Sequence, residues 1–203
     1  MSNQIVPTKG NLIATKRSLE LAKTGFELLD RKRNILIREM MGLIERANTI
    51  QDKIDKTYEE AYAALQIANI TLGVCGELAQ TVPEENNLNV AYRSVMGVEI
   101  PMVSLEKTYT PIPFGLHSTN SMIDNAYLKF NDVKQLTAEL AEVENSVYRL
   151  ADAIKKTQKR ANALKNIMIP RFEITVKTIT DALDEKDREE FSRLKVIKKQ
   201  KAG

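Results

Sequence analysis

The sequence predicts an all-α protein with one small β-hairpin, in which a long antiparallel two-helix coiled coil forms most of the molecule. Apolar residues recur in heptads over two long stretches of the chain. A proline-rich stretch with alternating polarity separates these two stretches. Aromatic residues make up only 5% of the 203 residues and tryptophan is absent, which is atypical of a large globular core.

The first long helix is predicted to start at Thr8, which can cap it, and to continue to about residue 79. Two interleaved rows place apolar side chains alternately three and four residues apart, which makes one continuous seam. A charged side chain in such a seam is costly unless it is paired, so Arg33 is predicted to control the helix register or to contact a partner. The rows are Leu12, Leu19, Phe26, Arg33, Met40, Ala47, Ile54, Ala61 and Thr15, Ala22, Leu29, Leu36, Leu43, Ile50, Thr57, Ala64.

A short β-hairpin is predicted within residues 81–116, which contain four of the six prolines. β-type alternation runs through Val90, Tyr92 and Ser94 and resumes in a second run from Val98. Gly97 lies between the two runs and can supply the turn.

The second long helix is predicted within residues 117–203. Around Pro170 the phase of its seam slips, and a bend is expected there because proline removes a backbone hydrogen bond. The seam runs through Val133, Leu136, Leu140, Val143, Val147, Leu150, Ile154, Thr157, Ala161, Leu164 and Met168, and then through Phe172, Val176, Ile179, Leu183, Phe191, Leu194 and Ile197.

The three segments, residues 1–80, 81–116 and 117–203, are predicted to form one structural unit. Because the two helices flank the hairpin and have similar lengths, they can fold back on each other with both chain termini at the same end. The alternative that the pattern leaves open is a dimer of two such chains.

No motif of an enzyme is present, so catalysis and a bound cofactor are not expected. Phosphate-binding glycine loops and cysteine pairs are absent, and the single histidine, His117, is predicted to be a cap-region residue before the second helix. The single Cys75 suits a reducing compartment. With no apolar run long enough for a membrane helix, a cytoplasmic location is predicted.

Charge is unevenly distributed although the net formal charge is only +3. Residues 155–171 and 192–203 contain basic but no acidic side chains, whereas residues 76–106 hold five glutamates against Arg93 alone. In an antiparallel hairpin this makes one end basic and the other acidic. Each lysine alone suits a solubilising surface, whereas the gradient as a whole fits an end that faces a partner at least as well as a solubilising surface.

Four segments, in order along nearly the whole chain, resemble the D subunits of V-type and archaeal-type ATP synthases. The start, P-T-K at 7–9 with residues 25–33, is similar to the family's opening helix, although Asp30 stands where lysine is usual. Residues 95–101 resemble its V-M-G-V-x-x-P hairpin. Residues 159–173 are similar to its R-R-V-N-A-L and I-P-x-L-E signature, and residues 190–195 continue the match.

The resemblance implies a non-catalytic rotor shaft that transmits torque between a hexamer of nucleotide-binding A and B subunits and the membrane ring. It further implies that the F subunit clasps the shaft and that the hairpin end lies toward the socket protein above the ring, the C or d subunit. The chain would then be peripheral to the membrane.

Three sets of site residues follow as hypotheses. Lys9, Lys16, Arg17, Lys195, Lys198 and Lys199 are predicted to face the collar formed by the hexamer. Arg31, Lys32, Arg33, Lys159, Arg160, Lys165 and Arg171 are predicted to form a mid-shaft basic zone. Met96, Gly97 and Pro101 belong to the hairpin.

The alternative is a basic coiled-coil protein that associates with nucleic acid or acts as a homodimeric scaffold. The sequence has no basic loop interleaved with aromatic residues and no recognition-helix motif, which argues against binding of nucleic acid. We therefore predict no nucleic-acid partner.

Overall fold

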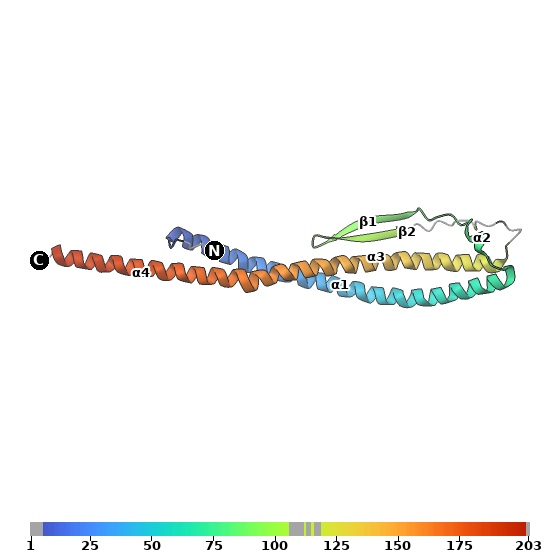
Figure 1. Ribbon diagram of the computed structural model, residues 1–203, viewed down its shortest axis with the longest axis horizontal. Helices are drawn as coiled ribbons and strands as arrows, with labels where there is room; N and C mark the ends of the chain where they lie inside the picture. Colours follow the sequence, from blue (N-terminus) through green and yellow to red (C-terminus); the bar gives the residue numbers. More distant parts are fainter. Residues whose placement is uncertain (1–5, 106–111, 113–114, 116–118, 202–203) are drawn as a thin grey trace. The chain divides into compact units, whose positions relative to one another are not determined.

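The computed structural model describes residues 6–105, 112, 115 and 119–201, and Figure 1 shows the order of its elements. His117 lies outside the described residues. The predicted fold is confirmed, since two long helical segments flank one antiparallel hairpin. The elements are α1 (Lys9–Leu72), α2 (Gly76–Ala79), β1 (Leu88–Val95), β2 (Val98–Leu105), α3 (Ser121–Ala163), the π-helix η1 (Leu164–Met168) and α4 (Ile169–Lys201).

The chain divides into two compact units. The first comprises residues 1–34 and 155–203, and therefore holds the start of α1, the end of α3, η1 and α4. The second comprises residues 35–154 and holds the rest of α1 and α3 together with α2 and the hairpin.

The ends of α1 follow local backbone chemistry. As predicted, Thr8 caps the start, because its hydroxyl oxygen accepts a hydrogen bond from the Asn11 amide at 3.2 Å. The helix ends at Leu72 rather than near residue 79. The reason is Gly73, whose φ of +80° is the left-handed conformation that commonly terminates helices.

The heptad seam of both helices is confirmed by burial. Every seam residue predicted between Leu12 and Ala64, and between Val133 and Met168, is buried or half-buried. Leu36 and Leu150 are completely buried in the second unit. Three buried residues, Ile50, Ile54 and Val143, form a further core cluster of that unit.

The hairpin doubles back along α3 in the second unit (Figure 1). Its two strands pair in register, from Leu88 opposite Leu105 to Val95 opposite Val98. Ile100 of β2 is 3% exposed and packs with Leu36 and Leu150, which joins the hairpin to both long helices. This position was not anticipated, because alternation within a strand does not show which helix the strand packs on.

The phase slip near Pro170 has a structural cause in the first unit. The five residues of η1 form a π-helix, in which the Ile169 amide donates to the Leu164 carbonyl. This wider turn shifts the apolar stripe relative to the preceding α-helix. The expected bend at Pro170 stays a prediction.

Candidate partner-binding surfaces

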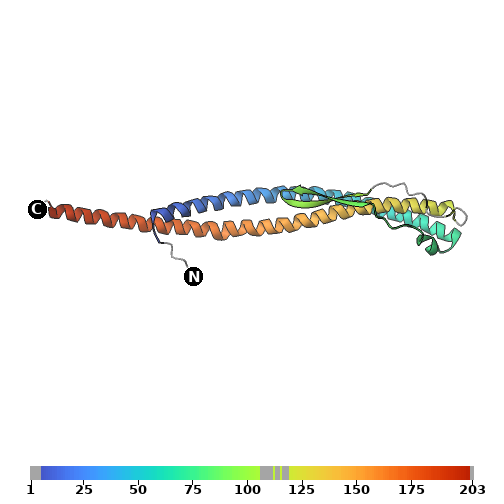
Figure 2. The same ribbon diagram turned by 90° about the horizontal axis from the view of Figure 1, so that it is seen from above.

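In the first unit α4 extends beyond the start of α1, as Figure 2 shows. The antiparallel register is marked by an ion pair of 2.8 Å between Lys23 and Glu173. In that register Lys9, the first residue of α1, falls opposite α4 near Asp187. The remaining turns of α4, up to Lys201, therefore have no second helix beside them among the described residues.

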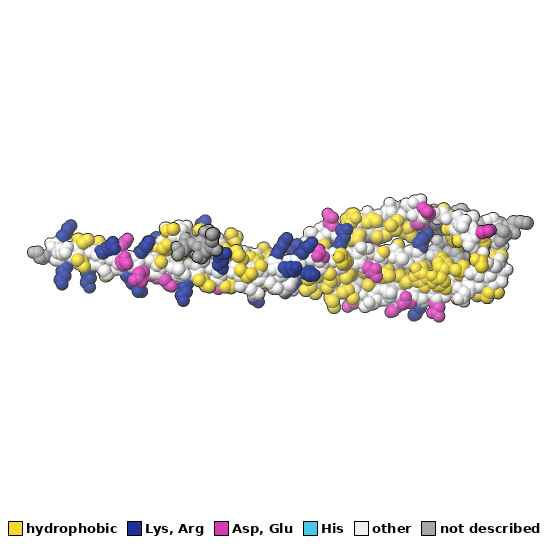
Figure 3. Space-filling view, viewed as in Figure 1, with side chains coloured by type: hydrophobic (Ala, Val, Ile, Leu, Met, Phe, Trp, Pro, Cys, Tyr) yellow, Lys and Arg dark blue, Asp and Glu magenta, His cyan; other side chains and the backbone are white. Residues whose placement is uncertain are grey.

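The C-terminal segment, residues 191–201, consequently exposes both apolar and basic side chains. Phe191, Leu194 and Ile197 lie three residues apart and are 69%, 64% and 49% exposed. The prediction that they continue the buried seam is wrong, because α1 does not reach them. Basic side chains surround this apolar stripe with no acid in the segment, and dark blue groups follow this end of α4 in Figure 3.

The residues predicted to face the collar all belong to the first unit and are all exposed. Lys9, Lys16 and Arg17 lie on the first turns of α1. Lys195, Lys198 and Lys199 lie on the last turns of α4. The structure thus brings residues from both ends of the sequence into one unit.

The mid-shaft basic zone also lies within the first unit, but its members differ in surroundings. Arg31, Lys159, Arg160 and Arg171 are exposed, and Lys32 is half-buried. The Lys165 ammonium lies 5.7 Å from the centre of the Phe26 ring, a cation–π contact between η1 and α1.

Arg33 is held within the helix pair. Its guanidinium donates to the Gln158 side-chain oxygen at 2.8 Å and to Asp30 at 2.6 Å, and its side chain is 24% exposed. Gln158 donates in turn to Asn162 at 2.9 Å. The seam arginine is therefore satisfied by polar partners on both helices. Its role in controlling the register or in contacting a partner stays a prediction.

The hairpin turn consists of Met96 and Gly97. Both have positive φ, 51° and 76°, as the tight two-residue turn of a twisted hairpin requires. Met96 adopts this conformation despite carrying a side chain, which is uncommon outside glycine, asparagine and aspartate. Pro101, in contrast, is buried in β2.

Three polar side chains of α3 contact the backbone of β2, and sequence reasoning missed all three. Glu142 accepts a hydrogen bond from the Val103 amide at 2.6 Å. Ser146 donates its one hydroxyl hydrogen to the Glu142 carbonyl at 2.7 Å and lies 3.5 Å from the Pro101 carbonyl, and Arg149 donates to the Glu99 carbonyl at 3.2 Å. The signal available in the sequence was a polar Ser146 next to the seam position Val147; in the structure Ser146 is 1% exposed.

Two ion pairs connect α1 to α3 in the second unit. Arg46 pairs with Glu139, and Lys129 with Glu60, each at 2.5 Å. The hydrogen bond from Lys129 holds the pKa of Glu60 below its ordinary value, and the same bond raises the pKa of Lys129. The hydrogen bond to Glu139 likewise raises the pKa of Arg46.

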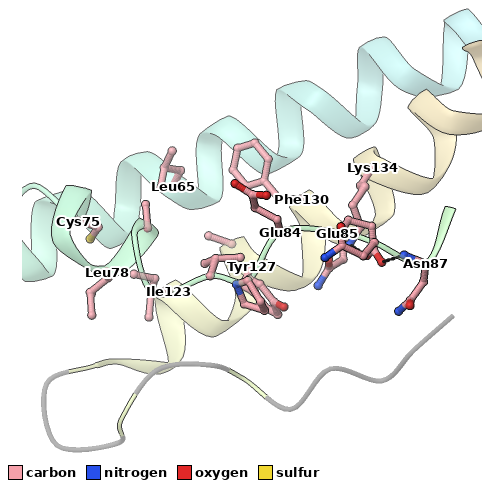
Figure 4. Close-up of a pocket in the computed structure, with 16 residues that line it drawn as sticks. Leu65, Cys75, Leu78, Glu84, Glu85, Asn87, Ile123, Tyr127, Phe130 and Lys134 are labelled. Carbon is pink, nitrogen blue, oxygen red and sulfur yellow. Dashed lines mark hydrogen bonds and ion pairs between the residues drawn. The ribbon is translucent and has the colours of Figure 1, made fainter. Parts of the chain in front are cut away.

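A cavity of about 730 Å³ lies where the chain leaves α1 and passes α3, and Figure 4 shows its lining. Leu78, Ile123 and Phe130 contribute apolar walls. At its polar side Lys134 pairs with Glu85 at 2.6 Å. That hydrogen bond, with one from the Asn87 amide, lowers the pKa of Glu85.

Within the described residues, no helix combines the length and the apolar character that a membrane crossing demands.

Comparison with known proteins gives a consistent result over nearly the whole chain. The family described as the D subunit of ATP synthase matches residues 11–199. The D subunit of the V-type ATP synthase of Thermotoga neapolitana is 47% identical over 200 residues, covering 98% of both chains. The D subunits of the A-type ATP synthases of Methanopyrus kandleri and Pyrococcus furiosus are each 37% identical, covering 95% and 96% of this chain and 84% and 94% of theirs.

Proposed function

The chain belongs to the family of ATP synthase D subunits, and we propose that it is the non-catalytic central shaft that carries torque through a rotary V-type ATPase or ATP synthase. Membership in this family makes the chain a component of an ATP synthase complex, and it favours the rotor over the nucleic-acid-binding or scaffold alternative.

The C-terminal segment is the observation that carries the proposal. It is one helix wide, its apolar stripe is exposed, and its charges are all positive. A single helix is narrow enough to enter the axial opening of a ring of subunits. Exposed apolar side chains that no other described residue covers indicate a surface that another protein covers.

Torque transmission requires that the two helices do not slide past each other. The continuous buried seam opposes sliding, because each apolar side chain would have to leave a close-packed site. In the first unit, the contact of Arg33 with Gln158 adds a polar link between the helices. In the second, the pairs of Arg46 with Glu139 and of Lys129 with Glu60 do the same.

The proposed partners are those that the resemblance to the D subunits implies. The A and B subunits form the collar around the C-terminal segment and the first turns of α1, and the F subunit binds the side of the shaft. The hairpin unit faces the socket protein above the membrane ring, the C or d subunit, so the chain itself stays peripheral to the membrane. Hydrolysis in the hexamer turns the shaft, and ion flow turns it for synthesis.

Isolation of the tagged chain from cytoplasm and membranes, followed by mass spectrometry of the bound proteins, tests the assembly. We expect the A, B and F subunits. Recovery of nucleic acid, or of the chain alone, would overturn the proposal.

A second experiment tests the collar contact in the complete complex. Lys198→Gln with Lys199→Gln should lower the number of ions pumped per ATP while hydrolysis continues, because the rotor tip then loses contacts that hold it in the collar. Lys53→Gln with Lys56→Gln is the matched control, since it removes the same charge from exposed positions in the other unit. If both double variants pumped the same number of ions per ATP, the proposed contact of Lys198 and Lys199 with the collar would be contradicted.

A further inference from the structure

The two outer edges of the hairpin differ in their hydrogen bonding. The Val103 amide points away from β1, because it donates to Glu142 on α3. Pro101, which has no amide hydrogen, occupies an equivalent outward position two residues earlier, and its carbonyl lies 3.5 Å from the Ser146 hydroxyl. The outer edge of β2 is therefore occupied by side chains of α3.

In the part of the chain that the structure describes, no side chain hydrogen-bonds to the outer edge of β1 in this way. Val90 lies opposite Val103 and Tyr92 opposite Pro101, so their backbone groups also point away from the partner strand. The same alternation directs the amides and carbonyls of Leu88 and Ser94 outward. Among the described residues, none of these outward groups of β1 has a hydrogen-bond partner.

The side chains on this strand are exposed as well. Leu88, Val90 and Tyr92 lie on one face of the hairpin and are 49%, 49% and 60% exposed. Soluble proteins usually protect a strand edge with charged side chains, especially lysine, or with proline, a bulge or a covering element. The eight residues of β1 contain one charged side chain, Arg93, but no lysine or proline, and they pair with β2 without a bulge.

We propose that the open edge of β1 receives a β-strand from another protein of the complex, which extends the hairpin to a three-stranded antiparallel or mixed sheet. Backbone hydrogen bonds to the outward groups of β1 supply the affinity in this mode of binding. This surface is distinct from the collar-facing C-terminal segment, and the inference rests on the proposed function only in placing the chain within a complex.

The chemistry of β1 specifies the strand that it takes. The exposed side chains of Leu88 and Val90 require aliphatic or aromatic side chains opposite them on the added strand. The Tyr92 ring on the same face, in contrast, already carries the Arg149 guanidinium 5.5 Å from its centre. Arg93 projects on the opposite face of the hairpin, is exposed, and has no acidic partner among the described residues. Residues 86–98 contain no acid. A carboxylate on the second face of the added strand therefore complements Arg93.

Amide hydrogen exchange on the purified complex, compared with the isolated chain, tests the proposal at single-residue resolution. In the isolated chain the amides of Leu88, Val90, Tyr92 and Ser94 should exchange fast, whereas the ladder amides of Ala91 and Arg93 exchange slowly. In the complex the outward amides should slow by about tenfold or more, together with the amides of one strand in the protein that binds there.

Val90→Pro provides the specific perturbation. The proline removes an outward amide hydrogen and places its ring in the path of an added strand, as Pro101 does in β2, yet it leaves the ladder with β2 complete. It should weaken binding of the strand-donating protein by about tenfold or more, while Val90→Thr, which keeps the amide, does not. Unchanged helix content and melting of the isolated Val90→Pro chain would show that it folds.

The outcomes separate this inference from the proposed function. Outward amides that exchange equally fast in the free and assembled chain would overturn the inference while the rotor assignment stands. Protection that arises from a second copy of this chain would overturn it as well. A chain that assembles with no other component of an ATP synthase would instead contradict the proposed function.

Discussion

The attachment of the hairpin to α3 should depend on Glu142. Its carboxylate accepts the Val103 amide at 2.6 Å, and Glu142→Ala would leave that half-buried amide without an acceptor. Hydrogen bonds to charged groups contribute roughly 1.5–3 kcal/mol. We therefore expect Glu142→Ala to lower the free energy of local hairpin opening by about 2 kcal/mol. Glu142→Gln, which keeps a neutral acceptor, should cost about half as much.

Exchange of the Val103 amide measures this directly. A loss of about 2 kcal/mol corresponds to roughly 30-fold faster exchange through local opening. Glu144→Ala is the matched control, because Glu144 is exposed two residues further along α3 and the change has the same effect on helix propensity. The reasoning would be refuted if Val103 exchanged at the same rate in all variants, or if the control accelerated it equally.

Three further predictions concern the helix pair and the turn. A double-mutant cycle of Arg33→Met with Gln158→Met should give a coupling of about 1 kcal/mol in the free energy of unfolding, and strictly additive losses would contradict the link. Because Lys129 lowers the pKa of folded Glu60, their pair stabilises the fold above the ordinary carboxyl pKa, and this stabilisation is lost as the pH falls through the lowered value. Glu60→Gln should therefore reduce the loss of melting temperature in acid. If the melting temperature depended on pH identically in the original chain and in Glu60→Gln, that result would count against the pair. Met96→Asn should stabilise the hairpin by about 0.5 kcal/mol, seen as slower exchange of its ladder amides, since asparagine tolerates positive φ better; faster exchange would argue against the left-handed turn.

Local chemistry made much of the fold predictable. Seam residues such as Leu36 and Leu150 follow a heptad, so burial of one of them implies burial of its neighbours along the same face. The cap at Thr8 and the turn at Gly97 depend on residues within a few positions of each other. The end of α1 at Gly73 was not predicted, because apolar residues continue after this glycine and the helical pattern of the sequence therefore extends beyond it.

The candidate partner-binding surfaces were harder to predict from the sequence than the fold. The basic side chains of the C-terminal segment could be counted, but the exposure of Phe191 depends on where the opposite helix begins. Arg33 was recognised as costly in a seam, yet its partner Gln158 is 125 residues away and could not be chosen from many polar side chains.

By itself the sequence determined that two long amphipathic helices pair around a hairpin, because a period of seven and an alternation of two are properties of neighbouring residues. Tertiary structure alone decided that β2 faces Glu142, Ser146 and Arg149 and that, among the described residues, the outer edge of β1 has no hydrogen-bond partner. A strand has two equivalent edges until it packs on something, so its own residues cannot specify which edge is covered. That choice is made by the register between the hairpin and α3, which joins residues about forty positions apart.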